Sequence, residues 1–191
     1  VLAERHDPVT VSHGYSFFGD LKYPADFPHL DYVNPDAPKG GEISQWGFGT
    51  FDSFNAYARK GNTASLSSVP YEAILTGFAD DATATYCFLC TTIEYPESLD
   101  WAIFNLRDDV TFSDGSAMAA EDVKFTFDLF MEQGLPSYRA AVSGMVASIE
   151  VLDPLRIKFV FAEEAPRRDV IELAGGIPVF SKSWFESTGA R

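Results

Sequence analysis

The spacing of apolar side chains changes partway along this chain. Over residues 101–106 the side chains alternate between two faces, with the two-residue period of a β-strand. Asp114 and Gly115 then break the chain, as this pair commonly does in turns. Over residues 123–131 apolar side chains recur every three or four positions, as on one face of an α-helix. The pattern predicts a strand, an acidic turn and an amphipathic helix in close order.

Other stretches repeat these two patterns and predict the remaining elements. Asp153 and Pro154 stand between two apolar runs, which indicates a β-hairpin. Gly134 and Gly77 each follow a run of helical period and are expected to end those helices. The predicted strands cover residues 42–48, 91–95, 101–107, 149–152 and 155–161, and the predicted helices cover 65–76, 119–131, 137–147 and 167–174.

The amino-terminal third of the chain is less regular. Residues 1–35 are rich in Pro, Asp, His and aromatic side chains without a sustained period, so we expect an extended arm lying on a surface. Gly47 and Gly49 flank Phe48 at the end of the first predicted strand. Glycine allows another backbone or a ligand to approach closely. This loop is therefore the best candidate for a ligand contact, with a plain connection between two elements as the alternative.

Composition narrows the classes of function. Hydrophobic residues make up 46% of the 191 residues and aromatic residues 15%, so one domain or two small lobes can bury a core. The 28 acidic residues outnumber the 14 basic ones and give a formal charge of -14. Such a surface repels nucleic-acid phosphates and anionic membranes. We expect no nucleic-acid partner. An acidic surface of this kind is typical of proteins whose net charge keeps them soluble.

Targeting signals are absent from the printed sequence. No apolar run approaches the ~20 residues that cross a bilayer. No basic segment followed by an apolar run opens the chain, so no signal peptide is expected within it. Because a mature or trimmed end would look the same, the sequence alone leaves the compartment open.

Cys87 and Cys90 form a Cys-x-x-Cys pair, for which three chemical states or roles are open. They can be two buried free thiols, one structural disulfide, or a redox or metal site. A four-thiolate zinc site is excluded within one chain because there is no second pair. A disulfide would be opposed by a continuous strand, in which residues three apart lie ~10 Å from each other.

Acidic and histidine side chains could form a catalytic or metal-binding site. Asp108, Asp109 and Asp114 resemble a carboxylate cluster, but their spacing fails the calcium-loop pattern, so turn and cap roles are expected. The three histidines of the chain all lie in the arm, without the helical spacing of a zinc site: His6, His13 and His29. No nucleophile, metal site or cofactor-binding loop is expected.

Residues 101–123 carry a resemblance to a known family. Their pattern, W-x-x-x-x-L-R-x-x-V-x-F-x-D-G-x-x-x-x-A-x-D-V, is similar to the signature of the family 5 extracellular solute-binding proteins of ABC importers. The matching residues are Trp101, Leu106, Arg107, Val110, Phe112, Asp114, Gly115, Ala120, Asp122 and Val123. Ile103 stands at the third motif position, where the family has Phe, and Phe104 follows it. Ala119 replaces the usual Thr, so we expect the helix to lack a capping hydroxyl worth ~1 kcal/mol.

A second stretch narrows the resemblance. His13-Gly14, Gly19, Lys22-Tyr23-Pro24 and residues 32–41 (YVNPDAPKGG) look like the amino-terminal arm of YejA-type peptide binders. Two long motifs in the right order are more specific than one short motif. Family 5 proteins are much longer and two-lobed, so we expect this chain to be an amino-terminal fragment of such a protein.

The resemblance implies a fold and a division into lobes. The fold class is α/β, with α+β in the small lobe, and the architecture is that of a type II-like periplasmic binding protein. Residues 1–35 would form the arm, 36–62 and 172–191 parts of the larger ligand-binding lobe, and 63–171 the small accessory lobe.

The resemblance also implies a function. A monomeric binding protein in the periplasm would capture a peptide or peptide-like solute and deliver it to an ABC permease in the inner membrane, without catalysis or a cofactor. The loop after the first strand borders the ligand cleft in this family, which assigns ligand contacts to Phe48, Gly49, Thr50 and Phe51. Closure would be a hinge motion that ligand binding favours.

Two alternatives belong to other classes. One is a metal-dependent hydrolase that uses Asp108, Asp109 and Asp114 with the histidines of the arm. The other is a protein-interaction module that docks through the arm. The ligand itself could be an oligopeptide, a cell-wall peptide, a nickel chelate or a sugar.

Overall fold

The computed structural model describes residues 7–57 and 60–189. The chain divides into two compact units, one formed by the residues up to Leu21 together with those from Tyr71 onward, and the other by Lys22–Pro70. The first unit contains every helix and strand found among the described residues. The lobe boundaries expected above remain a prediction.

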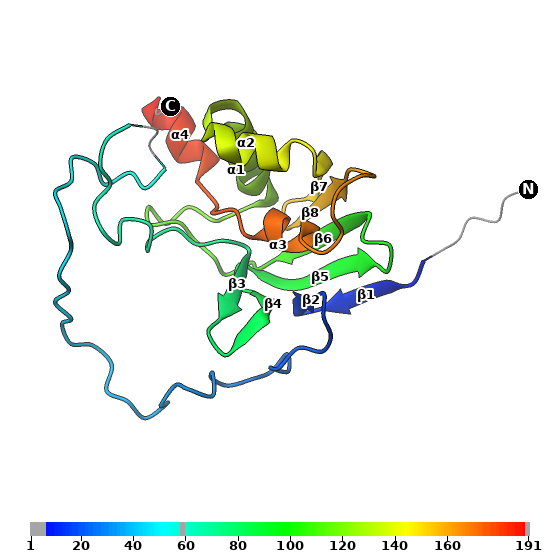
Figure 1. Ribbon diagram of the computed structural model, residues 1–191, viewed down its shortest axis with the longest axis horizontal. Helices are drawn as coiled ribbons and strands as arrows, with labels where there is room; N and C mark the ends of the chain where they lie inside the picture. Colours follow the sequence, from blue (N-terminus) through cyan, green and yellow to red (C-terminus); the bar gives the residue numbers. More distant parts are fainter. Residues whose placement is uncertain (1–6, 58–59, 190–191) are drawn as a thin grey trace, which may run out of the picture. The chain divides into compact units, whose positions relative to one another are not determined.

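Five antiparallel strands form the main sheet of the first unit (Figure 1). In spatial order they are β1 (Val9–Ser12), β5 (Cys90–Pro96), β6 (Trp101–Leu106), β8 (Arg156–Phe161) and β7 (Val146–Asp153). Phe104 of β6 stands opposite Ile93 of β5 and Ile157 of β8, and all three side chains are fully buried. The predicted strand pair β5–β6 and the predicted hairpin β7–β8 are thus confirmed, with β5, β6 and β8 in the middle of the sheet and β7 at its edge.

A second sheet has three strands. In spatial order they are β2 (Gly14–Ser16), β4 (Asp81–Cys87) and β3 (Leu75–Phe78), all antiparallel. Strands β1 and β2 lie inside the predicted surface arm, so that prediction is wrong for residues 9–16. The backbone of these residues pairs with strands that lie about 70 to 90 positions later in the chain, which no local pattern reveals.

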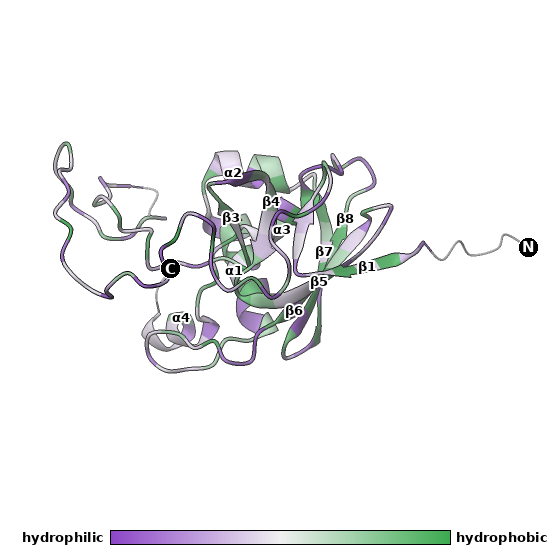
Figure 2. Ribbon diagram, turned by 90° about the horizontal axis from the view of Figure 1, so that it is seen from below, coloured by the Kyte–Doolittle hydropathy of each residue, from purple (hydrophilic) through white to green (hydrophobic). Residues whose placement is uncertain are grey.

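Helix α1 (Ala120–Gln133) covers the main sheet. It begins and ends where the sequence predicted within two residues, and Gly134 follows it. Phe127 packs edge-on against Phe159 of β8, which in turn contacts Phe104, with ring centroids 6.1 and 5.7 Å apart. Figure 2 shows hydrophobic residues along β8, and Ile157, Phe159 and Phe161 of this strand are buried. Apolar burial between helix and sheet is therefore the main stabilising contribution in this unit.

Two buried polar side chains of α1 hold residues 180–182, where helix α4 (Lys182–Thr188) begins. Ala119 has no side chain that can cap the helix, as expected. The backbone N–H of Ala119 donates a hydrogen bond to Asp122 Oδ2 at 2.8 Å. The other oxygen of Asp122 accepts from the N–H of Lys182, also at 2.8 Å. Thr126 Oγ1 accepts from the N–H of Phe180 at 2.8 Å. These bonds position α4, which the sequence analysis did not predict.

The remaining helices are shorter than expected. Helix α2 (Pro136–Val142) stops before the predicted end at 147, because Val146 already pairs with Phe161 in the sheet. Helix α3 (Val170–Gly175) starts three residues later than predicted. No helix among residues 7–57 and 60–189 is long and apolar enough to cross a membrane.

Two predicted elements are wrong. The helix expected over 65–76 is absent: residues 65–70 form turns, Leu66 and Val69 are exposed, and Leu75 starts strand β3. The strand expected over 42–48 is also absent. A strand requires a neighbour for its backbone groups, and none of the described residues pairs with this stretch.

Candidate functional site

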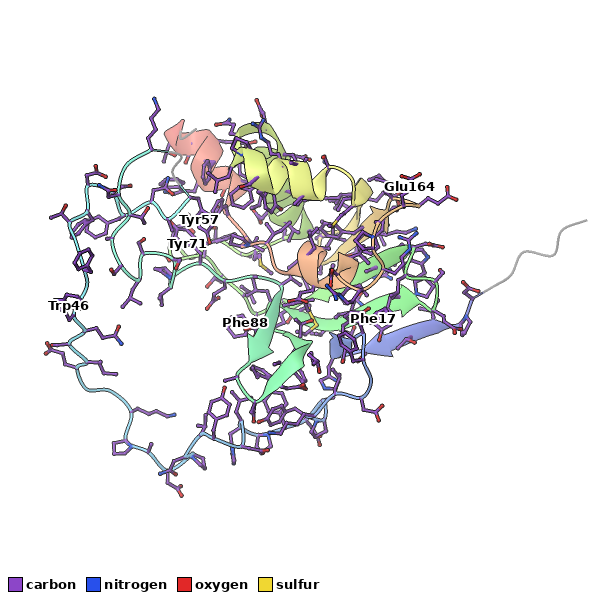
Figure 3. The ribbon with its side chains drawn as sticks, viewed as in Figure 1. Phe17, Trp46, Tyr57, Tyr71, Phe88 and Glu164 are labelled. Carbon is purple, nitrogen blue, oxygen red and sulfur yellow. A yellow bond between two sulfur atoms is a disulfide. The ribbon has the colours of Figure 1, made fainter. Side chains whose placement is uncertain are left out.

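The predicted ligand contacts lie in an aromatic segment, residues 46–54, within the unit Lys22–Pro70. Phe48 is 90% exposed and Phe51 is 56% exposed. Trp46, labelled in Figure 3, is 85% exposed and meets the ring of Phe48 edge-on at 6.0 Å. Phe51 contacts Phe54 at 5.1 Å. The segment therefore presents four aromatic rings on its surface.

The backbone of this segment is open as well. Gly49, between Phe48 and Thr50, has a φ of +91°, which L side chains rarely adopt. Among the described residues, the stretch from Glu42 to Phe51 makes no backbone-to-backbone hydrogen bond. Such a backbone can pair with an added strand, while its aromatic rings stack on the side chains of that strand.

Asp52 connects the carboxyl-terminal part of the aromatic segment to Asn62 through hydrogen bonds. Its carboxylate accepts a hydrogen bond from the N–H of Asn62 at 2.7 Å, and its own N–H donates to the Asn62 carbonyl at 3.0 Å. Ala64 N–H donates to the carbonyl of Ser53 at 2.8 Å. Residues 52–53 are thus held beside 62–64, while residues 46–51 have no such attachment to the described chain.

Cys87 and Cys90 form a disulfide with a Cα–Cα distance of 4.9 Å (Figure 3). The objection to a strand setting does not apply, because Cys87 ends β4 and Cys90 starts β5. Phe88 and Leu89 form the turn between them and donate their N–H groups to the Ile74 carbonyl. The disulfide therefore closes the turn that joins the two sheets.

Two aspartates of the predicted cluster, Asp109 and Asp114, bond to residues close to them in sequence. Asp109 receives two hydrogen bonds from the Arg107 guanidinium, at 2.8 and 2.7 Å, and these hold its pKa below the usual range. Asp114 Oδ1 accepts from the N–H and hydroxyl of Ser116, which lowers the pKa of Asp114 in the same way. The expected turn role is confirmed for Asp114, whereas Asp109 forms an ion pair with Arg107.

The histidines and acidic residues do not gather into a metal centre in the part of the chain that the structure describes. No group of three or more His, Cys, Asp or Glu side chains there is placed to hold a metal ion. His13 packs near the ring of Tyr86 at 5.9 Å, and His29 Nδ1 lies 3.0 Å from the Leu30 carbonyl. His6 lies outside the described residues.

Two surface hollows were not predicted from the sequence. One, of about 280 Å³, lies between α1 and α4 and is lined by Phe125, Asp128, Leu129, Glu132, Gln133, Phe185 and Glu186. The other, of about 120 Å³, lies between the three-stranded sheet and α3. The residues of the second hollow come from three distant stretches, around positions 15, 85 and 169. No local spacing in the sequence could have joined them.

Comparison with known proteins gives one family and several relatives. The profile described as bacterial extracellular solute-binding proteins, family 5 Middle, matches residues 94–189, half of the chain. The peptidoglycan-binding protein YepA of Agrobacterium fabrum is 34% identical over 178 residues, 89% of this chain. The probable peptide-binding protein YejA of the same organism is 34% identical over 176 residues, 92% of this chain.

The fold is also found among solved structures. The periplasmic binding protein DppA of Helicobacter pylori, in complex with the peptide STSA, matches 70% of this chain with a TM-score of 0.57 and 18% identity. This likeness shows a shared type II-like fold. The chain spans 29% of YepA, 28% of YejA and 29% of the DppA chain.

Proposed function

This chain belongs to family 5 of the bacterial extracellular solute-binding proteins, and we propose that the complete protein captures peptides or peptide-like solutes in the periplasm for an ABC permease of the inner membrane. The family match over residues 94–189 carries this proposal. The protein would act by binding and release, as a monomer and without catalysis. Its relatives are named as binding proteins, and two of the three aspartates in the predicted cluster are engaged by neighbouring residues, Asp109 by Arg107 and Asp114 by Ser116.

Peptides are the ligand class that the relatives favour. The names of two relatives refer to peptide and to peptidoglycan, and the DppA structure contains a peptide. An extended peptide carries a regular row of N–H and C=O groups, which an open backbone segment can pair with. The aromatic segment offers such a backbone together with exposed rings.

Phe48, Gly49, Thr50 and Phe51 would form one side of the ligand cleft. Gly49 would let the peptide backbone approach, and the two phenylalanine rings would pack on its side chains. Residues 36–62 and 172–191 would belong to the larger lobe, 63–171 to the accessory lobe, and 1–35 to the arm. The opposite side of the cleft would come from the rest of the complete protein, which would close over the ligand by a hinge.

Native mass spectrometry of the complete protein, purified from its own cells, tests the ligand class. We expect the protein to carry a series of added masses that match short peptides and that disappear on mild denaturation. A bound species of one mass without amino acids, such as a metal chelate or a sugar, would contradict the proposal.

A further inference from the structure

The two residues of the Cys87–Cys90 disulfide differ in their access to solvent. Cys90 is only 3% exposed and belongs to the apolar core, whereas Cys87 is half-buried at the end of β4. Phe88 follows Cys87 in the turn, is 41% exposed, and is labelled in Figure 3. A reagent in solution therefore meets this disulfide on its Cys87 side.

Hydrogen bonds hold the turn between the two cysteines without help from the sulfur atoms. The N–H groups of Phe88 and Leu89 donate to the Ile74 carbonyl, at 2.9 and 3.1 Å. Arg107 donates its backbone N–H to the Leu89 carbonyl at 3.0 Å, and its guanidinium donates to the Phe88 carbonyl at 3.1 Å. Each backbone polar group of the two middle residues is thus paired with a segment outside the turn. We expect the backbone of the turn to stay in place when the sulfur–sulfur bond is broken.

The size of the disulfide loop supports the same conclusion. The loop spans only residues 87–90, and the chain entropy that a disulfide removes from the unfolded state decreases with loop length. A backbone that stays in place also keeps the two Cα atoms 4.9 Å apart, within the range that a disulfide bridges. The two thiols of the reduced protein would therefore meet again on oxidation.

The buried sulfur atom has a hydrogen-bond acceptor ready for the reduced state. Cys90 Sγ lies 3.6 Å from the carbonyl oxygen of Ile74. A disulfide sulfur carries no hydrogen, but the S–H group of a thiol can donate to this oxygen. After reduction, Cys90 would stay in the core with this partner, and the thiol of Cys87 would lie nearer the solvent.

We propose that Cys87 and Cys90 form a reversible redox switch, which a dithiol opens by attack at Cys87. One thiolate of the dithiol bonds to Cys87 Sγ, the bond between the two cysteines breaks, and the sulfur of Cys90 leaves and takes a proton. The second thiolate of the dithiol then attacks the dithiol's first sulfur and releases Cys87, which takes the other proton. The dithiol becomes a disulfide and gives two electrons to the cysteine pair.

Opening the switch would remove the covalent link between the two sheets and leave the fold in place. Cys87 ends a strand of the three-stranded sheet and Cys90 starts a strand of the five-stranded sheet. The switch shares no residue with the aromatic segment, so its test is independent of the proposed peptide cleft.

Reduction of the complete protein under native conditions tests the switch. The protein is incubated with dithiothreitol, free thiols are trapped by alkylation, and the peptide that contains Cys87 and Cys90 is quantified by mass spectrometry. Tenfold more dithiothreitol should make reduction about tenfold faster, and urea below the unfolding transition should not accelerate it. The far-UV circular dichroism spectrum should stay unchanged, and oxidised dithiothreitol should restore the disulfide.

The opposite kinetics would overturn the proposal. If the rate were independent of the dithiothreitol concentration and rose with urea, the disulfide would open only through unfolding. Loss of the circular dichroism spectrum on reduction would also overturn it, because the fold would then depend on the disulfide.

Two single variants test which sulfur is attacked. Cys90→Ala leaves the thiol of Cys87 and Cys87→Ala leaves the thiol of Cys90, so each variant is the control for the other. We expect iodoacetamide to modify the Cys87 thiol at least about tenfold faster, because the Cys90 thiol is buried among apolar side chains. Equal rates, or a faster reaction of Cys90, would contradict attack at Cys87. The measurement on the unaltered protein does not depend on the folding of these variants.

Discussion

Asp122, a residue of the family signature, and Thr126, one turn later, hold a distant segment of the chain. Both are buried in α1, and their oxygens accept the N–H groups of Lys182 and Phe180, more than fifty positions later in the chain. In the sequence Asp122 stands out only as a motif residue, and nothing near it indicates its bond to Lys182. A helix end can be predicted from nearby residues, but a bond to a distant segment cannot.

We expect Thr126→Val to destabilise the chain by about 1–3 kcal/mol, because the buried Phe180 N–H loses its acceptor while the side-chain volume is kept. The measurement is urea unfolding of residues 1–191. Thr10→Val is the matched control, since Thr10 is exposed on the edge strand β1, and it should change stability by less than about 0.5 kcal/mol. Equal losses in the two variants would contradict the role assigned to Thr126.

At the scale of elements, the prediction succeeded where neighbours in sequence are neighbours in space. The hairpin β7–β8 and the pair β5–β6 are joined by short turns, so alternation alone located them. It failed for β1 and β2, whose partners are distant in the chain. It also missed the hairpin β3–β4, although these two strands are neighbours in sequence, because residues 65–76 show a helical spacing instead. It also failed for residues 42–48, whose alternating pattern has no partner strand in the described chain.

Gly14 is essential to the pairing of β2 with β4. A Cβ atom at this position would lie 2.6 Å from the backbone oxygen of Thr85, which cannot move away without breaking the ladder. Gly14→Ala should therefore cost about 1–3 kcal/mol in urea unfolding. Gly144→Ala is the control, because a Cβ there meets nothing within 4 Å, and a similar loss in both variants would argue against this explanation.

The disulfide between Cys87 and Cys90 closes a four-residue loop, and chain entropy then predicts a contribution of about 2 kcal/mol. Dithiothreitol should lower the stability of the chain by that amount. In the double variant Cys87→Ala/Cys90→Ala it should change nothing further. If the reductant destabilised the double variant as well, its effect would have another source.

At the scale of the whole molecule, the two units differ in what they bury. The unit with both sheets has a continuous apolar core, whereas Ile43, Trp46 and Phe48 of the other unit are at least 85% exposed. Exposed aromatic clusters of this kind mark binding surfaces. The sequence alone could indicate the glycine-flanked Phe48, but it could not supply the second wall of a cleft, because that wall is not part of this chain under the proposal.

Binding measurements on the complete protein and on residues 1–191 separate the contribution of the aromatic segment from that of the second wall of the cleft. With a bound peptide identified from the native protein, calorimetry should give at least about tenfold weaker binding for Phe48→Ala/Phe51→Ala, since each lost aromatic contact is worth about 0.5–1.5 kcal/mol beyond its buried area. Phe88→Ala, which removes an exposed ring from the disulfide turn, should bind as the wild type does.

The isolated chain should bind this peptide far more weakly than the complete protein, because closure needs both walls. If the isolated chain bound with the full affinity, or if the double variant bound normally, the aromatic segment would not be one side of a two-walled cleft.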